Sequence, residues 1–142
     1  MINRLNEFIF LPIPADENAL ETARQFVLEH AERLNLPAPV IFKLELALEE
    51  ILVNVVHYAY PPGTTGVVEV GCLAEDDGIS LCIADSGRPF NPLEKETPDL
   101  NVEIEDRQIG GLGIFLTREM VDAIDYHREQ DRNIVTFTIR KP

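Results

Sequence analysis

Two alternating runs, residues 66–75 and 79–85, lie on either side of the turn sequence Asp77-Gly78. Apolar side chains at every second position place one face of a strand against a core, and Asp-Gly favours the tight turn of an antiparallel hairpin. The alternating apolar positions are Val68, Val70, Cys72, Ala74, Ile79, Leu81 and Ile83. The chain is therefore expected to fold around a hairpin with one buried face.

Two segments with helical periodicity precede this hairpin. In the first, Asp16 is a suitable N-cap for a helix that runs to about Leu36. Its apolar stripe consists of Leu20, Ala23, Val27, Ala31 and Leu34. Prolines at positions 37 and 39 separate it from a second predicted helix at about 39–59, which the sequence Pro61-Pro62-Gly63 ends.

The remaining segments complete an α+β pattern. Residues 5–13 are predicted to form a strand. A third helix is expected from near Gly113 to about Ala123, and a final hairpin is expected at about 125–130 and 133–140. The stretch at about 91–110 has no clean period and is interpreted as a lid over a site. We therefore expect one domain over residues 1–142: a two-layer fold with three helices on one face of a mixed, mostly antiparallel sheet.

Charge and cysteine content limit the classes of partner. The 142 residues carry 25 acidic and 12 basic side chains, a net charge of −13. This charge repels phosphodiester backbones and anionic membrane surfaces, so no nucleic acid and no membrane partner are expected. Solubility alone explains most of the negative charge, and binding to a basic protein partner is the more specific alternative. Cys72 and Cys82 fit no disulfide framework or metal-ligand spacing, which favours reduced core thiols in a cytoplasmic protein.

The second predicted helix carries a carboxylate and an amide in apolar surroundings. Glu50 and Asn54 are four residues apart and therefore adjacent on one helical face. Their neighbours are Ile51, Leu52, Val53, Val55 and Val56. One interpretation is a solvated helix edge. The other is a metal site, in which Mg²⁺ accepts the amide carbonyl together with waters and phosphates, and the carboxylate orients or deprotonates an attacking group.

Two glycine-containing motifs follow. Asp85, Gly87 and Phe90 come directly after the predicted strand at 79–85. There a carboxylate can accept a hydrogen bond from an exocyclic amine such as that of adenine, and a glycine lets the backbone approach a flat ring. The alternative is an ordinary turn at the end of a strand, because Asp and Gly are common in turns. The sequence Gly110-Gly111-Leu112-Gly113 opens the third predicted helix, where exposed N–H groups and the helix dipole favour a phosphate; a glycine-rich hinge is the alternative.

Taken in order, these motifs resemble a known family. Glu50-x-x-x-Asn54, Asp85-x-Gly87-x-x-Phe90 and Gly110-Gly111-Leu112-Gly113 resemble the N, G1 and G2 boxes of the GHKL (histidine-kinase-like) ATPases, whose fold is the Bergerat type. The order of elements resembles the anti-sigma-factor branch, and the resemblance covers about residues 8–140. The branch's usual Asn-x-x-x-His pattern is changed, because Tyr58 stands at the His position.

The resemblance implies roles for individual residues. It implies that Glu50 is the general base, that Asn54 is the Mg²⁺ ligand and that Asp85 accepts from the adenine amine. Gly87 would lie beside the base, with Phe90 in the same box. The remaining nucleotide contacts would be Arg107 at the γ-phosphate and the helix-opening residues Gly110, Gly111, Leu112 and Gly113 around the phosphates.

The resemblance also implies an activity and partners. Members of this branch are ATP- and Mg²⁺-dependent serine/threonine protein kinases that phosphorylate a STAS-type anti-anti-sigma protein and bind a sigma factor or a related target. We therefore expect an enzyme of signal transduction that switches partners, with a homodimer also implied. The alternative is a nucleotide-sensing module that sequesters a partner without phosphotransfer; Glu50 favours the enzyme, because binding alone needs no carboxylate beside the γ-phosphate.

Overall fold

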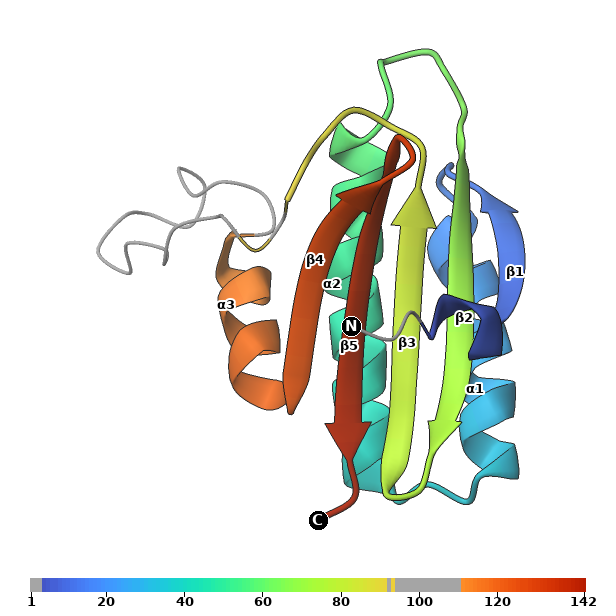
Figure 1. Cartoon of the computed structure of the whole chain (residues 1–142), viewed down its shortest axis with the longest axis vertical. Coiled ribbons are helices and arrows are strands. Elements are labelled where there is room, and N and C mark those ends of the chain that lie inside the picture. Colours follow the sequence, from blue (N-terminus) through green and yellow to red (C-terminus); the bar gives the residue numbers. More distant parts are fainter. Residues whose placement is uncertain (1–3, 92, 94–110) are drawn as a thin grey trace.

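The computed structural model describes residues 4–91, 93 and 111–142, and these form a five-stranded sheet with helices (Figure 1). The sheet has the strand order β1-β2-β3-β5-β4, and every pairing between these strands is antiparallel. The strands are β1 (Ile9–Pro14), β2 (Val67–Glu75), β3 (Gly78–Asp85), β4 (Ala123–Glu129) and β5 (Arg132–Arg140). The helices are α1 (Ala19–Arg33), α2 (Ala38–Tyr58) and α3 (Gly111–Met120), with the 3-10 turn η1 (Leu5–Glu7).

The elements are arranged in two layers. Helices α1 and α2 lie behind the sheet in Figure 1, and η1 crosses its front. Helix α3 packs against α2. The predicted α+β class, with helices on one face of a mostly antiparallel sheet, is confirmed.

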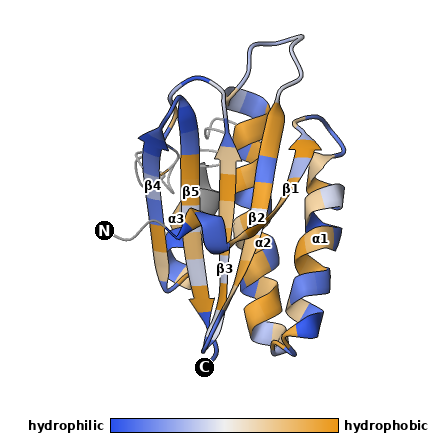
Figure 2. Ribbon diagram, turned by 45° about the vertical axis from the view of Figure 1, so that its right-hand side comes forward, coloured by the Kyte–Doolittle hydropathy of each residue, from blue (hydrophilic) through white to orange (hydrophobic). Residues whose placement is uncertain are grey.

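The main core lies between the sheet and the helices. Alternate residues of β2 and β3 point into it, so Val68, Leu81 and Ile83 are buried against α2 residues such as Leu48 and Ile51. Figure 2 shows the apolar residues concentrated on α2 and the central strands, whereas the end of β4 that joins β5 is hydrophilic. The alternation that predicted the hairpin therefore also predicted which face is buried.

Local hydrogen bonding moves several predicted boundaries. Asp16 does not cap α1: its carboxylate accepts from the backbone N–H of Asn18 at 2.8 Å, and the helix begins at Ala19. The helix ends at Arg33 because Asn35 adopts a left-handed backbone conformation with φ 53°. Residues 5–7 form η1 rather than the start of the first strand.

The third helix begins and ends earlier than predicted. It spans Gly111–Met120, and Ala123 already belongs to β4, because the N–H of Asp122 bonds to the carbonyl of Thr138 in β5 at 2.9 Å. The β4–β5 turn contains no glycine. Gln130 and Asp131 take its positive φ angles, 52° and 62°.

Cys72 and Cys82 are free and buried, as expected of core thiols. Burial raises the pKa of Cys72 to about 12 and that of Cys82 to about 11. Both thiols therefore stay protonated and poorly nucleophilic at neutral pH.

Part of the predicted site cannot be compared with the structure. Of the predicted lid at 91–110, only Asn91 and Leu93 are among the described residues. Arg107 and Gly110 lie outside them. No helix in the described ranges is both long and apolar enough to cross a membrane.

Candidate functional site

Helix α2 places Glu50 and Asn54 together. Asn54 is buried, with 1% of its surface exposed, and its Nδ2 donates to the carbonyl oxygen of Glu50 at 2.7 Å and to Glu50 Oε1 at 3.3 Å. Both acceptors lack a hydrogen to donate, so the donor end of the amide faces Glu50 and its carbonyl end points away. The predicted shared face is confirmed, and the half-buried Glu50 carboxylate is held by its neighbour on the helix.

Asp85 ends β3 as a buried carboxylate, 5% exposed. Its Oδ1 accepts from Asn133 Nδ2 and from the backbone N–H of Gly87, both at 2.9 Å. Within the described part of the chain no donor bonds to Oδ2. Burial raises the pKa of Asp85, and the two hydrogen bonds oppose this shift. One carboxylate oxygen is thus fixed by the fold and the other can accept from a ligand.

Gly87 lets the turn after β3 lie directly on the end of α2. A Cβ at this position would overlap the backbone carbonyl of Ala59. The next residue completes the contact, since the N–H of Arg88 bonds to that carbonyl at 2.8 Å. Gly87 therefore permits close packing between the turn after β3 and the end of α2, while its predicted place beside a flat base stays a prediction.

Gly87→Ala is accordingly expected to destabilise the fold. Relief of the overlap requires the turn to move off α2, at a cost of roughly 1–3 kcal/mol in the free energy of unfolding. Denaturant unfolding followed by circular dichroism measures the change. Gly63→Ala is a comparison for backbone strain alone: nothing lies near the added Cβ, and its φ of 82° by itself costs roughly 1–2 kcal/mol. Unchanged stability in Gly87→Ala would contradict the packing role of Gly87.

Phe90 and Tyr58 cover the same turn. Their rings stack with centroids 5.4 Å apart and an interplanar angle of 29°. The backbone carbonyl of Tyr58 also accepts from Arg88 Nε at 2.6 Å. The residue that replaces the expected His therefore packs on the Asp85–Phe90 turn.

Sequence reasoning missed three polar residues that hold this turn: Tyr60, Arg128 and Asn133. Tyr60 OH accepts from the N–H of Ser86 at 2.9 Å, and Arg128 donates to the carbonyl of Gly87 at 3.1 Å. Asn133 is 3% exposed and bonds to Asp85 itself. Only the register of β5 against β3 brings Asn133 opposite Asp85, and no spacing in the sequence indicates that register.

Helix α3 supplies the third predicted motif. It begins at Gly111, so Gly111, Leu112 and Gly113 lie in its first turn, where backbone N–H groups lack helical partners. The end of α3 that follows the grey trace in Figure 1 lies toward the same end of the molecule as the tip of β3 and the last turn of α2. The described parts of all three motifs thus lie toward one end of the fold.

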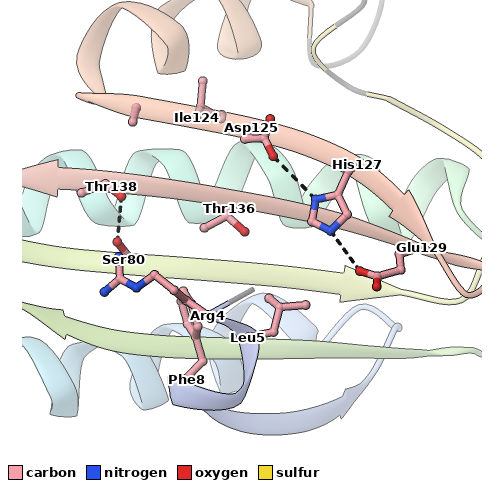
Figure 3. Close-up of a pocket in the computed structure, with 11 residues that line it drawn as sticks. Arg4, Leu5, Phe8, Ser80, Ile124, Asp125, His127, Glu129, Thr136 and Thr138 are labelled. Carbon is pink, nitrogen blue, oxygen red and sulfur yellow. Dashed lines mark hydrogen bonds and ion pairs between the residues drawn. The ribbon is translucent and has the colours of Figure 1, made fainter. Parts of the chain in front are cut away.

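The concave surfaces formed by the described residues include two cavities that matter for the site. One of about 580 Å³ adjoins the last turn of α2 and the turn after β3; it is lined by His57, Tyr58, Ala59, Tyr60, Pro61, Pro62, Ser86, Gly87 and Arg88. The other, of about 500 Å³, lies on the opposite face of the sheet beside η1 (Figure 3). There His127 lies between Asp125 and Glu129, with ring-nitrogen to carboxylate distances of 3.6 and 3.4 Å. None of the predicted site residues that the structure describes lines this second cavity.

Comparison with known proteins identifies relatives of this chain. Residues 13–139 match the family model of the histidine kinase-like ATPase domain. The chain is 34% identical over 112 residues to the serine/threonine-protein kinase BtrW of Bordetella bronchiseptica, covering 78% of this chain and 79% of that protein. It is 26% identical over 141 residues to the serine-protein kinase RsbW of Bacillus subtilis, covering 95% and 85%.

A solved structure shows the same fold. The crystal structure of the RsbU and RsbW domains of a Mycobacterium tuberculosis protein superimposes with a TM-score of 0.64 at 20% identity. The match covers 93% of this chain and 32% of that longer chain. With the family model matched over residues 13–139, the chain belongs to the histidine kinase-like ATPase domain family.

Proposed function

We propose that this protein is an ATP-dependent serine/threonine protein kinase that phosphorylates a STAS-type anti-anti-sigma protein. The observation that carries the proposal is the Glu50–Asn54 pair, a half-buried carboxylate held by a buried amide on α2. A site that only binds nucleotide needs no such carboxylate. The similarity to BtrW and RsbW, both named as protein kinases, supports the same activity.

The adenine base of the nucleotide would be recognised by Asp85. Its Oδ2 would accept from the exocyclic amine of adenine while Oδ1 stays bonded to Asn133 and Gly87. The first turn of α3, from Gly111 to Gly113, would face the phosphates with its N–H groups. Arg107 remains the proposed γ-phosphate contact, as the resemblance implies.

The donors near Glu50 also fit Mg²⁺. The Asn54 amide carries the kind of hard carbonyl oxygen that this ion prefers, and it is buried beside Glu50. When bound, Mg²⁺ would neutralise charge on the phosphates. Glu50 would take the proton of the partner's serine or threonine hydroxyl. The hydroxyl oxygen would then form a bond to the γ-phosphorus as the bond to the bridging β–γ oxygen breaks, which yields phosphoprotein and ADP.

The surrounding biology follows from this activity. We infer a cytoplasmic partner-switching system in which the unphosphorylated STAS protein and a sigma factor or related target compete for the kinase. The homodimer implied by the resemblance belongs to the same proposal. The fold would act here as a single ATP-binding domain.

Phosphotransfer tests the proposal. Purified protein, γ-labelled ATP with Mg²⁺ and a candidate STAS partner should yield label on a partner serine or threonine. Omission of the kinase, and a partner with its candidate hydroxyl residues replaced by alanine, are the controls. If the partner binds in an ATP-dependent way but is never labelled, the protein is a nucleotide-gated binding module and not a kinase.

A further inference from the structure

Asp85 belongs to a row of polar residues that crosses three neighbouring strands. Asp85 on β3 is directly opposite Asn133 on β5, and Asn133 is directly opposite Arg128 on β4. Residues opposite one another in antiparallel strands project from the same face of the sheet. The three side chains are joined by hydrogen bonds, from Asn133 to Asp85 at 2.9 Å and from Arg128 to Asn133 at 3.1 Å.

Asn133 uses both ends of its amide in this row. Its Nδ2 donates to Asp85 Oδ1 and, at 2.8 Å, to the carbonyl of Arg88. Its Oδ1 accepts from the N–H of Phe90 at 3.2 Å, from Tyr126 OH at 2.7 Å and from Arg128. The orientation of the amide is unambiguous, because the groups facing Nδ2 only accept and the N–H groups facing Oδ1 only donate. With 3% exposure the side chain has no room to turn.

These contacts constrain the Asp85 carboxylate as well as the turn that follows it. Both donors to Asp85, Asn133 Nδ2 and the Gly87 N–H, converge on Oδ1. The carboxylate cannot rotate about its Cβ–Cγ bond without breaking them, so Oδ2 keeps one direction. A preorganised acceptor loses less entropy when a ligand donor arrives.

We propose that Asn133 is the positioning residue for base recognition: it holds Asp85 so that Oδ2 discriminates adenine from a base without an exocyclic amine at that edge. This rests on the proposed nucleotide site. Asn133 acts through Asp85 and does not itself contact the nucleotide. Arg128 and Tyr126 support it from β4 by occupying its carbonyl end.

The test compares ATP with inosine triphosphate, which carries a carbonyl in place of the adenine amine. Calorimetric titration of the full chain with each nucleotide and Mg²⁺ gives the ratio of their dissociation constants. In Asn133→Leu this ATP preference should fall about tenfold, the equivalent of one charge-assisted hydrogen bond. A purely structural loosening would weaken both nucleotides equally and leave the ratio unchanged.

Two further variants keep the test decisive. Tyr126→Phe removes only one bond to Asn133 and should lower the preference about threefold in a folded protein, so it carries the test if Asn133→Leu fails to fold. Ser80→Ala is the matched control: Ser80 is a buried polar residue of β3 that bonds to Glu75 and Thr138, away from the turn after β3, and its loss should leave the ratio unchanged.

The outcomes separate this inference from the proposed function. A wild-type preference for ATP that survives in Asn133→Leu or, if that variant is unfolded, in Tyr126→Phe overturns the role of Asn133 and leaves the kinase proposal intact. Equal wild-type binding of both nucleotides overturns amine recognition by Asp85, and the inference with it. If wild type binds no ATP, the proposed nucleotide site itself is wrong.

Discussion

Glu50→Gln should lower phosphotransfer to the partner by roughly 10²–10⁴-fold while ATP affinity stays near normal. The amide cannot take the hydroxyl proton, yet its oxygen can still accept from Asn54 Nδ2, so the local structure of α2 is kept. Single-turnover transfer of labelled phosphate measures the rate, and calorimetry measures ATP affinity. Glu49→Gln, an exposed neighbour on the same helix, is the matched control and should remain active.

Asn54 provides the contrast with Glu50. Asn54→Ala should damage both ATP binding and transfer, because it removes the proposed Mg²⁺ ligand and the group that holds Glu50. Full activity in Glu50→Gln would remove Glu50 as the base without removing the kinase. Loss of ATP binding in Glu50→Gln would instead assign the carboxylate to the binding of nucleotide or metal.

Asp85→Asn is expected to weaken ATP binding by roughly 1–3 kcal/mol, about 5- to 150-fold, without destabilising the fold. The oxygen of the new amide can still accept from Asn133 and Gly87. Its NH₂ group then replaces Oδ2 and meets the adenine amine donor to donor. Calorimetry with ATP and GTP checks the binding, and equal wild-type affinity for GTP would contradict the Asp85 assignment.

The pKa of Asp85 predicts the matching stability result. Burial raises this pKa above its unfolded value, so the folded state binds the proton more tightly and the stability from this group is lost as pH rises through the raised pKa. The amide in Asp85→Asn does not titrate, so this substitution removes that pH-dependent loss of stability. Denaturant unfolding at a series of pH values from 4, near the ordinary pKa of an Asp carboxyl, to 7 should therefore show a smaller decline with pH in the variant than in wild type. An equal decline would mean that Asp85 does not titrate in this range.

Local periodicity predicted much of the fold. The alternation in β2 and β3 and the stripe of α1 identified strands, helices and the buried face, because burial is repeated at fixed intervals along each element. The exact ends were less predictable. Asp is a residue type that often caps helices, but the Asp16 carboxylate accepts from the N–H of Asn18 in a turn instead. Whether Asp16 caps the helix or forms this turn depends on how β1 leads into α1.

The candidate site was likewise predictable only in part from the sequence. Glu50 and Asn54 could be paired from their spacing, since one helical turn brings them together. Asn133, 48 residues from Asp85, could not, because strand register is a property of the whole sheet. Gly87 was expected to let the backbone approach a flat ring, which stays a prediction; its contact with Ala59 was not foreseen, because it depends on how the turn packs against α2.

The central claim is that the nucleotide binds at the end of the fold where α2 ends, β3 ends and α3 begins, and not on the outer face of the sheet. NMR titration of the labelled full chain with Mg²⁺ and a non-hydrolysable ATP analogue tests it directly. We expect the largest shifts at the side-chain amide of Asn54 and at the backbone amides of Gly87, Phe90 and Gly113. Shifts confined to His127 and its neighbours in the outer cavity would contradict the account.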